Sequence, residues 1–358
     1  MTERLSDAWR AFCADLAEAG AVLDRGPATA LDQAEGLRYL SRLTRTALNM
    51  LVDSSDPDFP RIFQLCDDKL KIGADNPDNI YQQLCVRGDR RYRLTGKRGT
   101  VPYLSLGSKA NRYAIDGTMV STGEVEFDDV ASEPDGSFEI FVGQTREGKN
   151  WLPLADDSTI VIIRQTFEDK TTQVPAMFEV ECLDGAAHPR LVTPEEIAAQ
   201  LAGTTAWVKG TASTFAGWTE MFMGRPNRIF EHDQAFFQRA GGDPKIWYGH
   251  AYYDLAPGEM WEITFTPPPG TRMWNFQLDN WWMESLDHVH HKIWVNNTQV
   301  TPESDGSVRL ICADADLRQK AESAGNWLDL AGHRSGTALF RWIEAPSHPV
   351  PQCRVIRA

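Results

Sequence analysis

The second half of the chain repeats segments of the first half in a constant order. The matching pairs are residues 92–103 with 261–274, 135–138 with 305–308, and 150–155 with 326–331. After the last pair, each copy continues into an apolar run that contains a single arginine, Arg164 in the first copy and Arg341 in the second. Ordered matches of this kind indicate one structural unit used twice. The repeat therefore predicts two related β units within one chain.

Size and composition narrow the class of protein. At 358 residues the chain exceeds the usual size of a single core, which favours two domains. An apolar content of 42%, with 12 Trp and 16 Phe, is enough for a packed interior. The formal net charge is −14, and no basic patch with interleaved aromatic residues is present. We therefore expect a small-molecule ligand, and neither nucleic acid nor a membrane as a partner. The sequence does not predict the oligomeric state.

The N-terminal residues and the cysteines bear on location. Residues 1–7 are polar and show no apolar stretch of the kind found in a secretory signal. No run reaches the roughly 18 apolar residues that span a bilayer. The six cysteines are scattered and form no CxxC pair, which is typical of reduced thiols. We expect a cytoplasmic protein with no cofactor and no metal.

Changes in pattern divide the chain into four segments. Residues 1–55 form a helical segment, 56–190 a first β unit, 191–245 a helical joint, and 246–358 a second β unit. The predicted fold is mainly β with helical additions. It consists of two tandem β-sandwich or jelly-roll-like units related by internal duplication, with N-terminal helices and a helical joint.

Periodicity gives the elements within these segments. Helices are predicted at 5–19, 37–51, 207–222 and 229–237, and Thr29 is the expected cap of the second. Strands are predicted at 80–86, 92–95, 138–142, 159–167 and 177–182 in the first unit. In the second unit they are predicted at 247–254, 260–266, 273–278, 289–295, 308–312, 338–343 and 354–357.

A histidine-rich segment of the second unit is the candidate catalytic site. Asp287 is followed by His288 and His290, and a strand here would place both imidazoles on one face. The pair fits general acid–base chemistry or contact with an anion, with Asp287 orienting the imidazole. It also fits a metal pair with no third ligand fixed by spacing, or a plain polar strand. On such a strand His291 would face the core.

The preceding strand carries a polar stripe. Asn275, Gln277 and Asp279 alternate with apolar residues, and Asn280, Trp281 and Trp282 follow. One interpretation is a solvated strand face. The other is a hydrogen-bonding wall of a pocket whose floor is Trp281 and Trp282, because aromatic rings beside amides hold sugars and apolar ligands. We take Asn275, Gln277, Asn280, Trp281 and Trp282 as candidate substrate-binding residues.

Arg341 and His333 are further candidates for substrate binding. Arg341 lies in an apolar run, and a buried guanidinium must meet a carboxylate or a ligand anion. Because Arg164 holds the matching place in the first copy, a structural ion pair in both copies is one explanation. Bidentate binding of a carboxylate, sulfate or phosphate by Arg341 is the other.

Several segments of the chain resemble a known bacterial family. They are 274–278, 282–287, His290-His291, 326–329, 332–336 and 340–342. The chain is similar there to the domain-of-unknown-function 1214 family. The resemblance covers the last third well, and segments 71–79 and 136–167 look similar to the N-terminal part of longer relatives. It implies a β-sandwich or jelly-roll architecture and implies no catalytic residues.

The sequence carries no P-loop, GxGxxG, GxSxG or HExxH motif, so it points to none of the reactions those motifs serve. The leading hypothesis is an enzyme acting on a small or lipid-like, possibly anionic, organic substrate. It would use metal-independent hydrolysis or lyase-type acid–base chemistry. The alternatives are a non-catalytic carbohydrate- or ligand-binding β-sandwich protein, and a scaffold whose histidines only satisfy the core.

Overall fold

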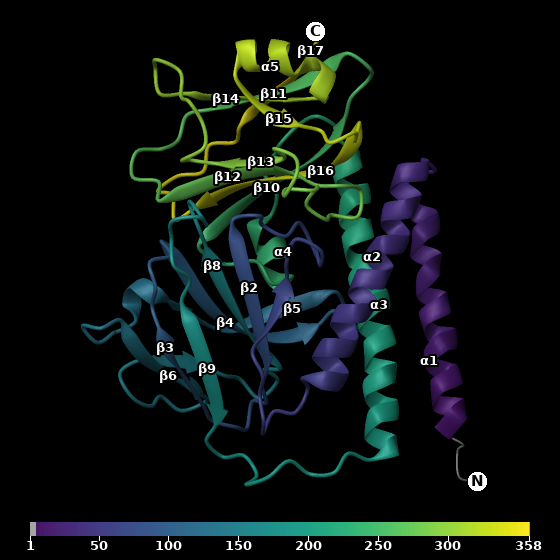
Figure 1. Ribbon diagram of the computed structural model, residues 1–358, viewed down its shortest axis with the longest axis vertical. Coiled ribbons are helices and arrows are strands. Elements are labelled where there is room, and N and C mark those ends of the chain that lie inside the picture. The colour runs from purple at the N-terminus through teal and green to yellow at the C-terminus, as the bar shows by residue number, and fades with distance from the viewer. Residues whose placement is uncertain (1–4, 358) are drawn as a thin grey trace.

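The computed structural model describes residues 5–357, and this part of the chain is mainly β. It contains four sheets and five α-helices. Figure 1 shows the second β unit above the first, with α1, α2 and α3 along one side. The helices are α1 (Leu5–Ala19), α2 (Ala30–Leu48), α3 (Pro194–Met223), α4 (Gln234–Arg239) and α5 (Arg318–Ala324).

The first β unit has two sheets, with strand orders β1-β2-β8-β4-β5 and β7-β6-β3-β9. Apolar side chains from both sheets, such as Leu84, Leu94, Leu106, Ile140 and Val161, form one core between them. The strands are β1 (Phe63–Cys66), β2 (Asn79–Cys85), β3 (Tyr92–Lys97), β4 (Tyr103–Arg112), β5 (Thr118–Glu126), β6 (Ser137–Gly143), β7 (Trp151–Pro153), β8 (Ile160–Thr166) and β9 (Met177–Cys182).

The second β unit also has two sheets, with strand orders β10-β16-β12-β13 and β15-β14-β11-β17. Its core again lies between the sheets and includes Tyr253, Trp261, Phe276, Leu310 and Phe340. The strands are β10 (Ile246–Asp254), β11 (Glu259–Phe265), β12 (Met273–Leu278), β13 (Trp294–Asn296), β14 (Val308–Ala313), β15 (Asn326–Asp329), β16 (Ser335–Ile343) and β17 (Gln352–Arg357).

The two units have equivalent strand orders. Strands β2 to β9 of the first unit correspond in sequence order to β10 to β17 of the second. The order β2-β8-β4-β5 matches β10-β16-β12-β13, and β7-β6-β3-β9 matches β15-β14-β11-β17. Only β6–β7 and its equivalent β14–β15 are parallel pairs among the named strands. The repeated Asn-Trp pair makes equivalent contacts. The Trp151 and Trp327 Nε1 atoms donate to the carbonyls of Gly143 and Ala313, at 2.9 and 3.1 Å.

Helix boundaries follow from their caps. The Thr29 hydroxyl accepts the Asp32 N–H at 3.1 Å, which is the cap that the sequence predicts. Thr193 and Glu196 form a capping box at the start of α3. At 30 residues α3 is about 45 Å long, and Figure 1 shows it running beside both units.

A third core joins the helices to the two β units. It contains Tyr39 from α2, Trp207 and Phe215 from α3, Ile162 from β8 and Leu339 from β16. Ile162 and Leu339 lie on the faces of their sheets that point away from the unit cores. The helices therefore cover a surface to which both units contribute, and the candidate site lies in this region.

The structure corrects several predicted elements. The helix predicted at 229–237 is α4, which begins only after its cap, Asp233. The strand predicted at 289–295 is a turn followed by the short strand β13. Five strands were not predicted, namely β1, β4, β5, β7 and β15.

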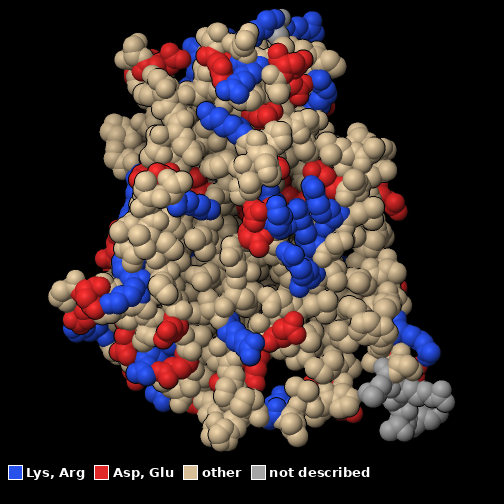
Figure 2. All heavy atoms as spheres, in the orientation of Figure 1, with Lys and Arg blue, Asp and Glu red and all other residues tan. Residues whose placement is uncertain are grey.

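The helices of the described residues include no membrane-spanning candidate. Across residues 5–357, every helix is too short or too polar to cross a bilayer. Figure 2 shows acidic and basic side chains interspersed on one face, with broad uncharged areas between them.

Candidate functional site

A cavity of about 150 Å³ lies where the two β units meet the helices. Its walls come from β2, β4 and β8 of the first unit, β10 and β16 of the second, helices α3 and α4, and the loops before β2 and β10. The two β units and the helices between them therefore enclose one space.

Two buried arginines face this cavity from equivalent positions. Arg164 on β8 is 8% exposed and Arg341 on β16 is 4% exposed. Each is paired in strand register with a tyrosine, Arg164 with Tyr81 and Arg341 with Tyr248. All four residues line the cavity. The arginine–tyrosine pair of one unit is thus repeated by the other unit.

Each arginine reaches into the opposite unit. Arg164 Nη2 donates to the carbonyl of Gly241, and Arg341 Nη2 donates to the carbonyl of Ala74 at 2.5 Å. The residues beside the arginines do the same, since Ser105 Oγ binds Asp243 Oδ2 at 2.7 Å and Asn275 Nδ2 binds Asn76 Oδ1 at 2.8 Å. Reciprocal contacts of this kind define an interface with two-fold character.

The loops that supply these acceptors are also equivalent. The Tyr81 hydroxyl accepts the Asn76 N–H at 3.1 Å, and the Tyr248 hydroxyl accepts the Asp243 N–H at 2.8 Å. Among the described residues neither hydroxyl donates a hydrogen bond to the protein. Each O–H is therefore available to an acceptor inside the cavity.

The two guanidinium groups lack a carboxylate partner. Within residues 5–357, no carboxylate oxygen lies within 4.0 Å of the nitrogens of Arg164 or Arg341. Arg341 Nη1 binds the neutral amide oxygen of Gln277 at 2.5 Å. Arg164 Nη1 is buried and unpaired. The buried carboxylate of Asp243 binds a serine hydroxyl and a backbone N–H instead. Burial disfavours the charge of Arg164, but the nearby Asp243 carboxylate outweighs it and raises the pKa of this guanidinium.

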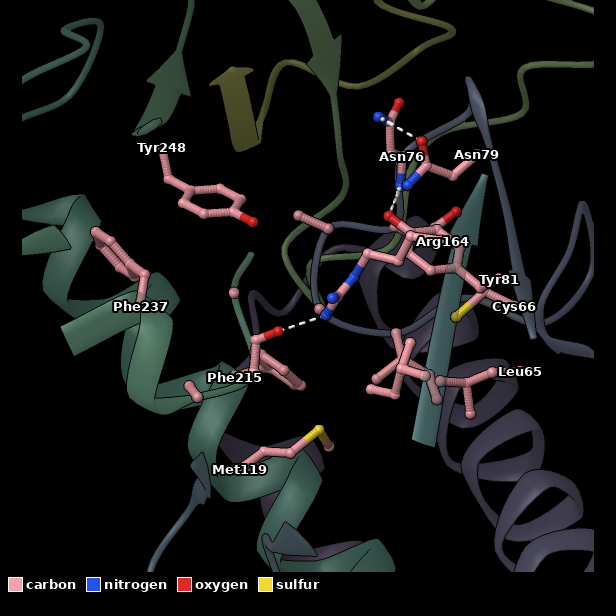
Figure 3. Close-up of a pocket in the computed structure, with 18 of the residues that line it drawn as sticks. Leu65, Cys66, Asn76, Asn79, Tyr81, Met119, Arg164, Phe215, Phe237 and Tyr248 are labelled. Carbon is pink, nitrogen blue, oxygen red and sulfur yellow. Dashed lines mark hydrogen bonds between the residues drawn. The ribbon is translucent and has the colours of Figure 1, made fainter. Parts of the chain in front are cut away.

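The rest of the cavity wall is mostly apolar and includes several aromatic rings. Figure 3 shows the Arg164 guanidinium pointing into a space bordered by Met119, Phe215, Phe237 and Tyr248. The rings of α3 and α4 pack edge to face, which fixes their positions. A charged end beside an apolar wall is suited to an amphipathic ligand.

Other polar atoms of the wall also lack partners. Gln83 Nε2, Trp207 Nε1 and His250 Nδ1 are buried and make no hydrogen bond within the described chain. Burial lowers the pKa of His250 well below its usual value, so this imidazole is neutral at pH 7. Buried polar groups are normally satisfied, so several unpaired atoms around one cavity indicate a bound molecule or water.

The predicted polar stripe of β12 lies at the interface between the two units. Gln277 Nε2 donates to the Asp75 carbonyl at 2.8 Å, and Asn275 Nδ2 donates to Asp78 at 2.9 Å. Burial raises the pKa of Asp279, which also accepts from Gln277 at 2.5 Å. The stripe is neither solvated nor a free binding wall, because the loop before β2 covers it.

Asn280, Trp281 and Trp282 are structural residues of the third core. Both tryptophans are about 1% exposed. Trp282 Nε1 donates to the Asp32 carbonyl of α2 at 2.9 Å, and Asn280 Nδ2 binds the Glu284 carboxylate at 3.1 Å. The prediction that the two rings form a pocket floor is wrong for this cavity, since neither lines it.

The histidine segment lies outside the cavity. The Asp287 carboxylate accepts the backbone N–H groups of Val289 and His290, which bends the chain into a turn. His290 Nδ1 contacts Asp287 at 2.8 Å on the exposed surface, and His291, predicted to face the core, contacts Asp329 there. His288 borders a separate polar space of about 180 Å³ beside the cavity. The predicted catalytic residues are thus not brought to the arginines.

His333 is buried in an ion pair with the N-terminal helices. Its Nε2 lies 3.1 Å from Glu35 Oε2 on α2. Burial opposes the charged imidazole, but the Glu35 carboxylate outweighs it and raises the pKa of His333. Of the candidate residues from the sequence, only Arg341 lines the cavity, with Asn275 and Gln277 holding it from behind.

The sequence pointed to Arg164 only as the counterpart of Arg341, and the rest of the first-unit side of this site was not predicted. Ala74-Asp75-Asn76-Pro77 matches Gly241-Gly242-Asp243-Pro244, and in both loops a tyrosine follows the proline by four residues. This further match between the two halves of the sequence would have identified Tyr81 and Tyr248 as equivalent. The contribution of α3 has no comparable pattern, because it depends on how the helix packs.

The cavity holds no arrangement suited to covalent catalysis. Cys66 borders it, but burial raises the pKa of this thiol well above its usual value, so it is not a ready nucleophile. Among residues 5–357, no three His, Cys, Asp or Glu side chains form a metal-binding group.

Comparisons with known proteins agree with the resemblance found in the sequence. The family described as "Protein of unknown function (DUF1214)" matches residues 81–168, which run from Tyr81 past Arg164. This match lies in the first unit, whereas the resemblance in the sequence rested on the last third. No curated protein matches the chain.

Two solved structures are similar over nearly the whole length. An uncharacterized protein from Burkholderia cenocepacia is 39% identical, with a TM-score of 0.94 and 99% of each chain covered. A protein from Vibrio parahaemolyticus is 10% identical, with a TM-score of 0.49 over 96% of this chain and 99% of the other. On this evidence the chain belongs to the domain-of-unknown-function 1214 family.

Proposed function

We propose that this protein binds a small organic anion with an apolar body in the cavity between its two β units. The observation that carries the proposal is the pair of buried guanidinium groups, Arg164 and Arg341, which face one cavity without a carboxylate partner among the described residues. A ligand carboxylate would supply a counter-charge in direct contact with the guanidinium groups, and the apolar wall would hold the apolar part.

Binding without turnover is the better supported of the two functions. Hydrolysis or lyase chemistry would need an acid–base group within reach of a reacting atom in the cavity. His290 and Asp287 lie on the surface, and His333 is held by Glu35. His250, the imidazole that does line the cavity, is a weak base because burial lowers its pKa well below the usual value, and it packs on Phe222 at a ring distance of 4.8 Å.

The cavity size guides the choice of probe. A dry protein cavity of about 150 Å³ accommodates a benzene ring, which is also the volume of this cavity. We therefore expect benzoate to bind in an isothermal titration and benzamide, which has the same shape without the charge, to bind at least tenfold more weakly, about 1.4 kcal/mol.

An arginine variant and a matched control complete the test. The double variant Arg164→Gln/Arg341→Gln should remove the preference for benzoate, because either arginine alone can still bind one carboxylate. Arg10→Gln should keep the preference, because the Arg10 side chain is 75% exposed on α1. Circular dichroism of each variant checks that it is folded. Equal binding of benzoate and benzamide to the wild-type protein, or binding of neither, would contradict the proposal.

We also propose that the two β units are copies of one ancestral jelly-roll-like unit. The matched strand orders and the equivalent contacts of Trp151 and Trp327 support this origin. Determining the structure of a family member with a single unit would test it. Such a protein should pair two identical chains around the same cavity.

A further inference from the structure

The two-fold character of the cavity bears on the chemistry of its ligand. This inference rests on the proposed function and narrows it. We infer that the ligand is a dianion, a small dicarboxylate with an apolar middle, and that each β unit binds one of its two carboxylates. Arg164 with Tyr81 takes one end and Arg341 with Tyr248 takes the other.

The two ends of the cavity carry equivalent arginine–tyrosine pairs. Strand register places each tyrosine directly beside its arginine on the neighbouring strand, where paired residues lie about 5 Å apart. Each tyrosine hydroxyl already accepts a backbone N–H and keeps its own O–H free. A guanidinium and a phenol O–H together form a donor set for one carboxylate, and the cavity contains this set twice.

The direct contacts of both guanidinium groups carry no charge. Both groups are buried, and their hydrogen bonds within the protein go to carbonyl and amide oxygens. Asp243 supports the charge of Arg164 without contacting it, and its equivalent position in the other half is Asn76. A ligand with two carboxylates would give each guanidinium an anion in direct contact, whereas one carboxylate would contact only one of them.

Hydrogen bonds within the protein hold both arginines in place before a ligand binds. Arg341 is fixed by Gln277 and by the Ala74 carbonyl, and Arg164 by the Gly241 carbonyl. Both carbonyl acceptors belong to residues with positive φ, 58° at Ala74 and 102° at Gly241, so the two loops share this backbone feature at equivalent positions. Groups fixed in this way lose little entropy on binding.

A series of probes tests the inference on the wild-type protein. Isothermal titration is run with glutarate, adipate and pimelate, and with pentanoate, hexanoate and heptanoate as monoanions of the same lengths. At the length that fits, we expect the dicarboxylate to bind at least about tenfold more tightly than its monocarboxylate partner, as expected for one additional charge-assisted contact.

Two variants then assign the ends. Arg164→Gln and Arg341→Gln should each lower the affinity of the dicarboxylate to that of the monocarboxylate, and Arg10→Gln should leave the tenfold ratio unchanged. If a glutamine variant does not fold, Arg164→Lys or Arg341→Lys, which retains the charge but loses the fork geometry, should reduce the ratio without abolishing it.

The outcomes separate this inference from the proposed function. A monocarboxylate that binds as tightly as the dicarboxylate at every length overturns the dianion, while anion binding in the cavity stands. If neither series binds, and benzoate does not bind either, both the inference and the proposed function fail. Loss of the ratio in only one of the two arginine variants overturns the assignment of one carboxylate to each unit.

Discussion

At the scale of single residues, one ion pair connects the two ends of the chain. Glu35 and His333 are 298 positions apart, and both side chains are less than 10% exposed. Glu35 also contacts Arg38 at 2.8 Å. Such a pair stabilises the folded protein only while both groups are charged, so its contribution depends on pH.

The pH dependence has a defined direction. The folded-state pKa of His333 lies above its usual 6.5, so its contribution is complete below about pH 6.5 and is lost as the pH rises through the raised pKa. For Glu35, burial acts against ionisation but His333 outweighs it, and the pKa is lowered from 4.5. Its contribution is therefore complete above about pH 4.5 and is lost as the pH falls through the lowered pKa.

We expect His333→Gln to lower the free energy of unfolding by about 3 kcal/mol at pH 5.5, because it leaves the Glu35 carboxylate buried without its partner. The difference from the wild-type protein should shrink at pH 8.5. Urea denaturation at both values measures this. The exposed pair of His290 and Asp287 provides the control, since His290→Gln should cost less than about 1 kcal/mol. A cost for His333→Gln that does not change with pH would refute the charged pair.

At the scale of elements, α3 is the part that the cavity depends on most outside the β units. It supplies Trp207, Phe215 and Trp218 to the wall. Its first turn is held by the Thr193 hydroxyl, which accepts the Glu196 N–H at 3.3 Å, and by the Glu196 carboxylate, which accepts the Thr193 N–H at 3.0 Å. The start of this helix is thus fixed by local contacts alone.

Thr193→Ala should destabilise the protein by about 1 kcal/mol, because two N–H groups of the first turn lose a side-chain partner or its geometry. Thermal unfolding measures the loss. Thr193→Ser keeps the hydroxyl and should retain most of the stability. Ligand affinity should not change, since Thr193 is far along the helix from the cavity-lining rings. An unchanged melting temperature in the alanine variant would show that the capping box contributes nothing to the stability of the protein.

Elements with regular patterns were predictable from the sequence, and those with mixed patterns were not. The alternation in 138–142 predicted β6, and the apolar run 338–343 predicted β16. Strand β4 reads YLSLGSKANR, and most of its residues are buried, including Ser105 and Lys109. Its polar residues are satisfied by partners from other elements, such as Asp243 and Glu124, so no alternation marks the strand.

The candidate site was predictable in part, for a physical reason. A charged residue in an apolar run is visible locally, and this identified Arg341 and its counterpart Arg164. The roles of Asn275 and Gln277 depend on which loop covers their strand, and that loop lies about 200 positions away. A turn at His288 depends on Asp287 accepting backbone N–H groups, which competes with the strand pattern.

At the scale of the whole molecule, the two units and the helices share buried contacts and should unfold together. Across the interface, Asn275 contacts Asn76 and Ser105 contacts Asp243. The third core also contains residues of both units. Separating the units would leave buried arginines and amides without partners. This cost couples the stability of each unit to that of the other.

Unfolding by guanidinium chloride should therefore follow one transition by two probes. Trp151 is the single tryptophan between residues 56 and 190, so fluorescence reports mainly the second unit and the helices, whereas far-UV circular dichroism reports the whole chain. We expect the same midpoint from both probes. A dichroism change that precedes the fluorescence change would show that the first unit unfolds independently.

The contacts between the loop before β2 and strand β12 also limit when the first unit can complete its structure during synthesis. Asn76 finds its partner Asn275 only after 199 further residues have been made, which takes roughly 10–40 s at ordinary rates of translation. Throughout that interval the first half leaves the ribosome with the face of Arg164 uncovered, and the acceptor oxygens of the loop before β2 lack their donors. The nascent chain must be kept from pairing with a neighbour, because the equivalent surface of another copy offers the same reciprocal contacts.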